Sequence, residues 1–175
     1  MRTIAITRGG QIVPYVIWGN WHQNFAPLRN NPADCGANAF YLLGYCNWHT
    51  ANYLADLTHW GLHWEIALLI INDAYPQIQH RFEQINDLDQ IRDHFDDHNI
   101  ATLAFITTAN HESHWFIIFI GDHILAIDPQ HYRQQPLDEF LNDLRATSLH
   151  ILNSDIIIDG NNRVTQEIID QHLTL

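Results

Sequence analysis

The chain has 175 residues, 46% of them hydrophobic, and a formal net charge of −12 at pH 7. A chain of this length and apolar content can bury a substantial core, so we expect a single globular domain over residues 1–175. The acidic charge argues against a nucleic-acid partner, because phosphate binding needs a basic surface. The apolar runs are too short to cross a bilayer, which favours a soluble protein with no membrane partner.

Lysine is absent from the chain, and all 8 basic residues are arginine. About ten lysines would be typical at this length. One explanation is a compositional bias of the source genome or environment. The other is selection against lysine amines, which accept ubiquitin and other acyl groups. The sequence leaves both explanations open.

An N-terminal hairpin and a series of helices are predicted for the first half of the chain. Residues 3–7 and 12–18 are β-type stretches on either side of a Gly-Gly turn, and Pro14 indicates that the second strand lies at a sheet edge. Helices are then expected to dominate as far as residue 98. Their apolar spacing places them at Cys35–Gly44, 50–57, 62–74 and 87–98.

The sequence period changes to a β-type pattern after residue 98. Strands are predicted at 100–107, 114–120, 123–127 and 148–159, and helices at 136–146 and 164–173. Because no internal repeat or linker is present, this order of elements predicts one domain of the α+β class.

Cys35 is the candidate nucleophile. It lies where a helix is predicted to begin, so backbone N–H groups and the helix dipole would favour its thiolate. Cys46 is expected to pack in the core. If both cysteines lie on one helix, roughly 16 Å separates them, which exceeds the roughly 7 Å limit for the Cα atoms of a disulfide. We therefore expect free thiols and a reducing, cytoplasmic compartment.

His114 and Asp128 are candidates for a general base and the group that orients it. His114 begins an apolar strand, and Asp128 ends the strand that follows. Since side chains alternate along strands, the two share a face only if the turn between the strands has an odd length. We predict a three-residue turn at 120–122 that places Phe119 opposite His123 and His114 opposite Asp128.

These residues resemble the papain-like cysteine peptidase superfamily, in which a nucleophile helix precedes a sheet that carries the His and its Asp or Asn partner. One set of motifs is similar to SUMO-specific and adenoviral proteases, in which the His precedes the Cys by circular permutation: Asp34-Cys35-Gly36, His114-Trp115 and Asp128-Pro129. A second set resembles papain-like proteins of large DNA viruses and bacterial toxins: Cys35, Asn38, Leu43-Gly44 and Asp128-Pro129-Gln130. The resemblance covers roughly residues 30–130 and implies a helical subdomain packed against an antiparallel sheet.

The resemblance implies a thiol-dependent hydrolase of peptide or isopeptide bonds, with ubiquitin or ubiquitin-like conjugates as the favoured protein substrates. Two alternatives stay open: a glutamine deamidase or transglutaminase of the toxin or effector type, and a papain-like binding module without activity. No cofactor is expected. The viral and bacterial likenesses also point to the cytoplasm of a host cell as one setting.

Papain-like enzymes usually carry a Gln or comparable oxyanion donor six residues before the Cys, and Arg29 occupies that position here. The candidate donors and substrate-binding residues are Asn31, Asn30, Gln23, Trp115 and Gln130, together with the backbone N–H of Cys35.

Two histidine pairs have a spacing that could bind a metal ion. They are His59 with His63 and His94 with His98, each at the i, i+4 separation of one helix face. Neither pair has a complete ligand set, so we expect solvated helix faces and no metal site.

Overall fold

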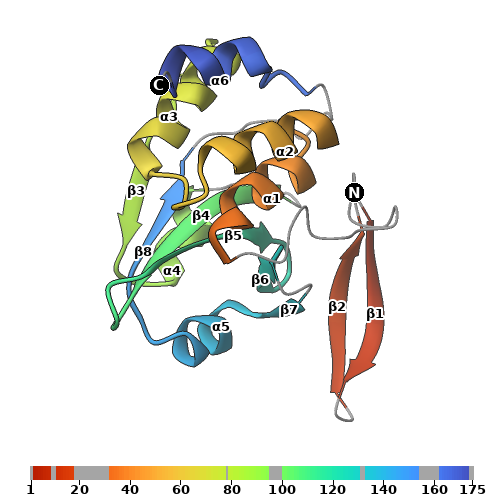
Figure 1. The fold of residues 1–175 in the computed structure, drawn as a ribbon. Coiled ribbons are helices and arrows are strands. Elements are labelled where there is room, and N and C mark those ends of the chain that lie inside the picture. Colours follow the sequence, from red (N-terminus) through yellow and green to blue (C-terminus); the bar gives the residue numbers. More distant parts are fainter. Residues whose placement is uncertain are drawn as a thin grey trace.

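A computed structural model of the chain describes residues 2–8, 11–17, 32–77, 79–94, 100–130, 133–153 and 162–173. These residues form helices and antiparallel sheets, consistent with the expected α+β class (Figure 1). One sheet has two strands and the other has six.

The N-terminal hairpin forms as predicted. Strand β1 (Arg2–Arg8) pairs antiparallel with β2 (Gln11–Ile17), and Arg8 lies opposite Gln11. Both strands of a two-stranded sheet are edge strands, so Pro14 lies on an edge strand, as its missing N–H requires.

The six-stranded sheet has the order β3-β8-β4-β5-β6-β7, and every neighbouring pair is antiparallel. Strand β8, which is late in the chain, lies between β3 and β4. The strands are β3 (Phe82–Ile85), β4 (Ile100–Thr108), β5 (Ser113–Ile120), β6 (Ile124–Asp128), β7 (Arg133–Pro136) and β8 (Ala146–Leu152).

The prediction that helices dominate up to residue 98 is wrong at β3, and β7 was also not predicted. Both are four-residue strands at the two edges of the sheet. Their sequences, Phe-Glu-Gln-Ile and Arg-Gln-Gln-Pro, are too short and too polar to show a strand period. Pairing with β8 and β6 makes them strands.

Helices cover both faces of the larger sheet. The helices are α1 (Cys35–Leu42), α2 (Trp48–Leu57), α3 (Trp64–Ala74), α4 (Asp89–His94), α5 (Leu137–Asp143) and α6 (Gln166–His172). Figure 1 shows α1, α2, α3 and α6 on one side of the sheet and α5 on the other. Helix α4 is shorter than the predicted helix at 87–98, of which residues 95–98 lie outside the described part.

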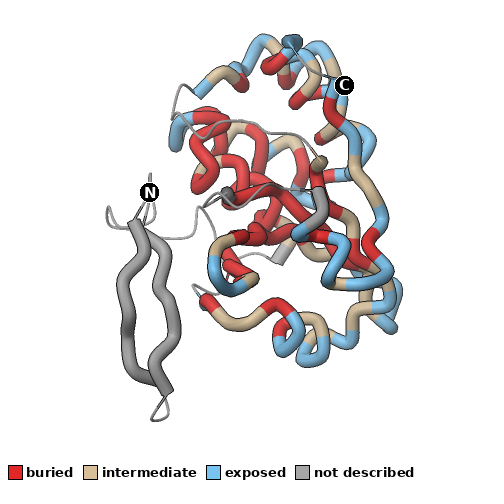
Figure 2. Tube along the Cα trace, turned by 180° about the vertical axis from the view of Figure 1, so that it is seen from behind, coloured by how far each residue is buried: buried red, intermediate tan, exposed pale blue. Residues whose placement is uncertain are grey.

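The two faces of the central strands belong to two hydrophobic clusters. Along β5, Trp115 and Ile117 pack with the α1–α3 side, whereas Phe116 and Ile118 pack with residues of α5 such as Phe140. Because successive side chains point to opposite faces, a strand covered on both faces reads as a continuous apolar run. Figure 2 shows this buried region in the middle of the molecule and the exposed residues along its outer helices and loops.

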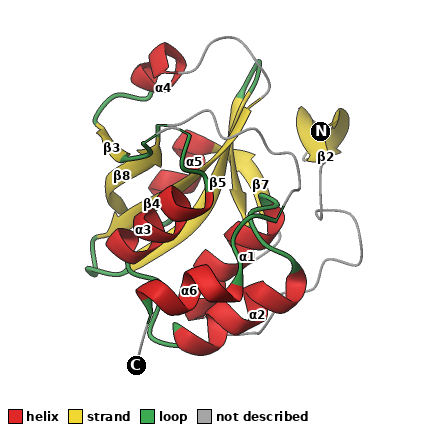
Figure 3. Ribbon diagram, turned by 90° about the horizontal axis from the view of Figure 1, so that it is seen from above, coloured by secondary structure: helices red, strands yellow, loops and turns green. Residues whose placement is uncertain are grey.

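The C-terminal segment ties the helical layer together. The backbone N–H of Val164 donates to the carbonyl of Tyr45 at 2.8 Å, just beyond α1. Helix α6 then lies beside α2 and α3 (Figure 3), where Tyr53 bonds to Asp170 and His172 pairs with Asp73 at 2.9 Å. The end of the chain therefore holds the layer that carries Cys35.

Candidate active site

Cys35 is the first residue of α1, as predicted. A 3-10 turn (Pro32–Asp34) leads directly into the helix. The helix ends at Leu42, and Gly44 just beyond it adopts a positive φ of 76° and donates its N–H to the carbonyl of Tyr41 at 3.0 Å. The Cys35 side chain is only 4% exposed, and its sulfur accepts a hydrogen bond from the backbone N–H of Trp115 at 3.4 Å. Helix α1 thus lies directly against the start of β5.

Gly36 permits this close approach. A Cβ atom at this position would lie 3.1 Å from Leu62 and 3.1 Å from the Trp115 ring. That ring is held in place because its Nε1–H donates to the Leu62 carbonyl at 2.8 Å. A side chain at residue 36 would push α1 away from β5, and the Cys35 sulfur would move with it.

His114 and Asp128 lie together at the start of β5 and the end of β6. His114 Nε2 is 3.2 Å from Asp128 Oδ1, and the carboxylate is 1% exposed. The backbone N–H of Gln130 donates to the same oxygen at 3.0 Å, and Arg133 lies 4.0 Å from the other oxygen. The carboxylate is therefore held by residues that follow β6 directly in the chain.

The register between β5 and β6 differs from the prediction. Ile120 lies opposite Ile124, so the turn is formed by residues 121–123, not 120–122. The turn does have an odd length, and His114 and Asp128 do share a face. Extending the register places Asp128 level with Phe116, so His114 reaches it diagonally from two residues away.

Interactions outside the hairpin help to hold this turn. The guanidinium group of Arg92 donates to the carbonyls of Gly121 and Asp122 at 2.8 and 2.9 Å. Either three-residue turn satisfies the alternation of side chains, so the hairpin sequence alone could not choose between them.

A hydrogen bond between the side chains of Cys35 and His114 completes the group. Since Nε2 faces Asp128, Nδ1 is the ring nitrogen left for the sulfur. Burial lowers the pKa of His114, but the hydrogen bonds and charges of Asp128 and Cys35 outweigh it and raise the pKa to about 10. The site therefore favours an imidazolium ring at neutral pH.

Gln130 is not among the residues that line the groove beside Cys35, and its contact with substrate stays a prediction. Its side-chain oxygen accepts a hydrogen bond from Asn38 Nδ2 at 3.0 Å, and both side chains are buried. Asn38 lies one helical turn after Cys35, so this bond joins the nucleophile helix to the segment that carries Asp128. The sequence signal that could have predicted this bond is Asn38 itself, an amide side chain in an otherwise apolar helix.

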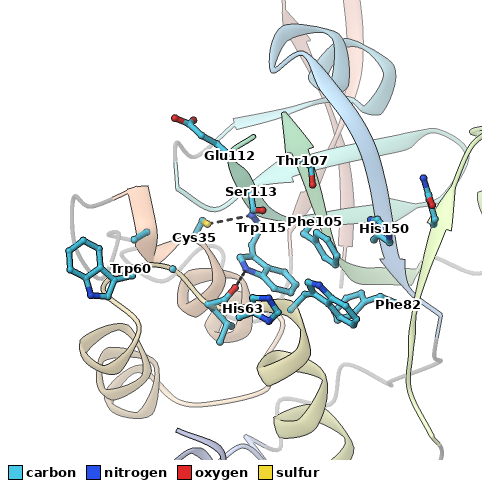
Figure 4. Close-up of a pocket in the computed structure, with 15 residues that line it drawn as sticks. Cys35, Trp60, His63, Phe82, Phe105, Thr107, Glu112, Ser113, Trp115 and His150 are labelled. Carbon is cyan, nitrogen blue, oxygen red and sulfur yellow. Dashed lines mark hydrogen bonds between the residues drawn. The ribbon is translucent and has the colours of Figure 1, made fainter. Parts of the chain in front are cut away.

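An open groove of about 1080 Å³ is lined by Cys35 (Figure 4). Aromatic rings make up much of its lining, including Trp60, Trp64, Phe82, Phe105 and Trp115. Trp115 therefore has the position expected of a substrate-binding residue. The role of Phe82 was not predicted, because it depends on the unpredicted strand β3.

The predicted oxyanion donors Asn31, Asn30 and Gln23 lie outside the described residues. The premise of a metal site at His59 and His63 is wrong, because His59 lies in the turn after α2 and His63 caps α3. Within the described ranges, no group of three or more His, Cys, Asp or Glu residues could hold a metal ion.

Cys46 contrasts with Cys35. It lies beyond Gly44 and not on the same helix, so the helix-length argument against a disulfide rested on a wrong premise. Both cysteines are nevertheless free thiols. Cys46 is fully buried in the core, and burial raises the pKa of its thiol far above the usual range, which makes it unreactive.

Comparison with known proteins gives no relative: no family model matches the chain, and neither does any curated protein. Along the described parts of the chain, none of the helices is long and apolar enough to cross a membrane. The function must therefore be inferred from the chemistry of the site.

Proposed function

We propose that this protein is a thiol-dependent hydrolase of the papain-like type that cleaves a peptide or isopeptide bond. One observation carries the proposal: Cys35, His114 and Asp128 are connected by hydrogen bonds, and Cys35 lines an open groove. Cys46 shows the contrast. Its thiol is buried in the core, and because burial raises its pKa, the thiol stays protonated and is a poor nucleophile.

In the proposed reaction, His114 takes the proton of Cys35, and Asp128 holds the resulting imidazolium in position. The thiolate attacks the carbonyl carbon of the substrate, and a new C–S bond forms. His114 then gives its proton to the departing amine as the C–N bond breaks, which leaves a thioester. Water attacks the thioester with His114 as the base, releases the acid and restores the thiol.

Negative charge on the carbonyl oxygen needs donors in the transition state. The backbone N–H of Cys35, at the N-terminal end of α1, is our first candidate. The helix dipole would add to its effect. A second donor is expected from the segment before Cys35, where Asn31, Asn30 and Gln23 stay as predictions.

Ubiquitin or ubiquitin-like conjugates are the favoured substrate class. The chain carries a net charge of −12, which suits a basic partner, and its lack of lysine suits a protein that works near ubiquitin ligases. The groove beside Cys35 is open, as entry of a chain segment of another protein requires. In the transferase alternative, an amine takes the acyl group of the thioester in place of water. In the deamidase alternative, the thioester forms from the side-chain amide of a glutamine.

A panel of ubiquitin and ubiquitin-like proteins with an electrophile in place of the C-terminal carboxylate tests the substrate class. We expect a covalent adduct on Cys35, identified by peptide mass spectrometry, and none on Cys46, which is an internal control in the same chain. The Cys35→Ala variant should form no adduct. Absence of an adduct with every modifier would remove this substrate class.

Iodoacetamide labelling at pH 6 tests the thiol chemistry without assuming a substrate. We expect Cys35 to react at least ten times faster than a free thiol, because a thiolate is the reacting form. The His114→Gln variant should lose this excess. A wild-type rate equal to that of a free thiol would favour the inactive binding module over either enzyme.

A further inference from the structure

A row of side chains crosses four strands on the face of the sheet that bears α1. Trp115 lies opposite Phe105, Phe105 opposite His150, and His150 opposite Gln84 in the strand register. All four line the same groove as Cys35. Figure 4 shows Phe105 and His150 continuing from Trp115 in the direction away from Cys35.

The row is a packed aromatic floor. The His150 ring stacks on Phe105 with centroids 4.7 Å apart and an interplanar angle of 5°, and Phe105 lies 5.1 Å from Trp115. Burial lowers the pKa of His150, which favours its neutral ring. Elsewhere in the lining of the groove, Trp60 is 91% exposed, and Trp64 stacks towards Phe105.

The length of the row sets the length of chain that it can contact. Four neighbouring strands are three spacings apart from first to last, or about 14 Å. An extended peptide advances about 3.5 Å per residue. The floor from Trp115 to Gln84 therefore matches about four residues of an extended chain.

The two faces of β5 indicate whether the bound peptide segment belongs to the acyl side or to the amine side of the scissile bond. The ring of His114 lies 6.2 Å from Phe140, on the α5 side of the sheet, whereas Trp115 packs on the α1 side. In the proposed reaction the departing amine must lie near His114. Because the aromatic row continues from Trp115 in the direction away from Cys35, on the face opposite to Phe140, we assign it to the acyl part of the substrate.

The charge of the groove limits the residues that it accepts. Among its described lining residues, Glu112 is the only acidic side chain, and neither Arg nor Lys is present. The whole chain is also strongly acidic. An acidic substrate side chain would meet the acidic charge of the chain and find no Arg or Lys in the described lining, whereas a large apolar side chain would be desolvated on the rings.

We propose that the row from Trp115 to Gln84 is an acyl-side specificity site for an extended, non-acidic segment of about four residues. A large apolar or aromatic side chain would lie on the half-buried ring of His150, beside the buried Phe105, at the third or fourth residue from the scissile carbonyl. The direction in which the substrate segment runs rests on the proposed hydrolase function. The preference for a large apolar side chain rests on the geometry of the groove.

Tetrapeptides with a C-terminal coumarin amide test this site in two ways. Each position carries Phe, Ala or Asp in turn, and the same peptides are assayed for hydrolysis by the wild-type protein and for binding to Cys35→Ala. We expect Phe at the third or fourth position to be preferred over Ala about tenfold in both assays, and Asp to be the weakest. Equal values for the three residues, or a preference confined to the first two positions, would overturn the inference.

Binding to Cys35→Ala separates this inference from the proposed function. Selective binding without hydrolysis by the wild type would contradict the hydrolase and support the apolar groove. Hydrolysis without selectivity would support the hydrolase and contradict the apolar groove.

Three variants locate the preference on the sheet. His150→Ala should reduce the Phe preference about fivefold, because one stacked ring is lost, and His150→Phe should keep it. His123→Ala is the matched control, since His123 is exposed in the β5–β6 turn and does not line the groove. An unchanged preference in His150→Ala would place the selective contact elsewhere.

Discussion

His114 is the residue on which the proposed chemistry depends. Its pKa is raised to about 10 despite the opposing effect of burial, because Asp128 and Cys35 both favour the charged ring. A raised pKa means that the charged form is fully present well below this value and is lost as the pH rises through about 10. The imidazolium that must protonate the leaving amine is then lost as well.

We therefore expect kcat/KM for a cleaved substrate to fall on the alkaline side near pH 10, where His114 loses its proton. In Asp128→Asn the alkaline limb should move to lower pH, since a neutral amide supports the imidazolium less well than a carboxylate. Activity should also fall by about 100-fold or more, as expected when an acid–base group is no longer supported.

The pH profiles of the wild type and Asp128→Asn, measured with one coumarin substrate, check this prediction. The Asp122→Asn variant is a matched control, because Asp122 is an exposed aspartate in the β5–β6 turn. An alkaline limb at the same pH in Asp128→Asn would show that the carboxylate does not govern the titration of His114.

At the scale of elements, the hydrogen bond between Asn38 and Gln130 joins α1 to the segment after β6. The two residues are 92 positions apart in the chain, and both side chains are buried. Cys35 is the first residue of α1, and Asp128 is the last residue of β6, two residues before Gln130. Their relative position therefore depends on how firmly α1 is attached to the end of β6.

A double-mutant cycle with Asn38→Ala and Gln130→Ala measures this attachment. We expect each variant to lose stability by about 1–3 kcal/mol in urea unfolding, and the pair to show a coupling energy of about 1 kcal/mol. The reaction of Cys35 with iodoacetamide should slow in both variants. Asn52→Ala is the control, because Asn52 makes only an exposed bond to the Trp48 carbonyl among the described contacts. A coupling energy near zero would mean that the two elements are held by packing alone.

At the scale of the whole molecule, helix α6 completes the layer that holds Cys35. Ile169 of α6 is fully buried in the same cluster as Cys35 and the residues of α1. Helix α6 contacts α2 and α3, and the segment before it bonds to the backbone at Gly44 and Tyr45. The cluster would therefore lose packing on one side if α6 were weakened.

Ile169→Ala tests whether α6 is part of the same cooperative unit as the site. We expect a loss of about 2–5 kcal/mol in the free energy of unfolding, and Cys35 labelling should become unselective at the same lower urea concentration. Ile168→Ala, at a partly buried neighbour, should cost less. Loss of α6 structure while Cys35 keeps its reactivity would contradict a single unit.

Local pattern in the sequence was enough to place the main candidates. Helix spacing and a closing glycine located Cys35 at the start of α1, because both signals depend on residues within a few positions of one another. Alternation along strands was enough to predict that His114 and Asp128 share a face. The hairpin at the N-terminus and the α+β composition followed from the same local periods.

Tertiary structure decided the rest, because the remaining features depend on partners far away in the chain. The insertion of β8 between β3 and β4 turned the Phe82 segment into a strand and aligned His150 with Phe105. The register of β6 moved by two residues relative to the prediction, although either register keeps the same faces buried. A sequence records which side of an element is apolar, but the neighbour that covers that side is chosen by the packing of the whole chain.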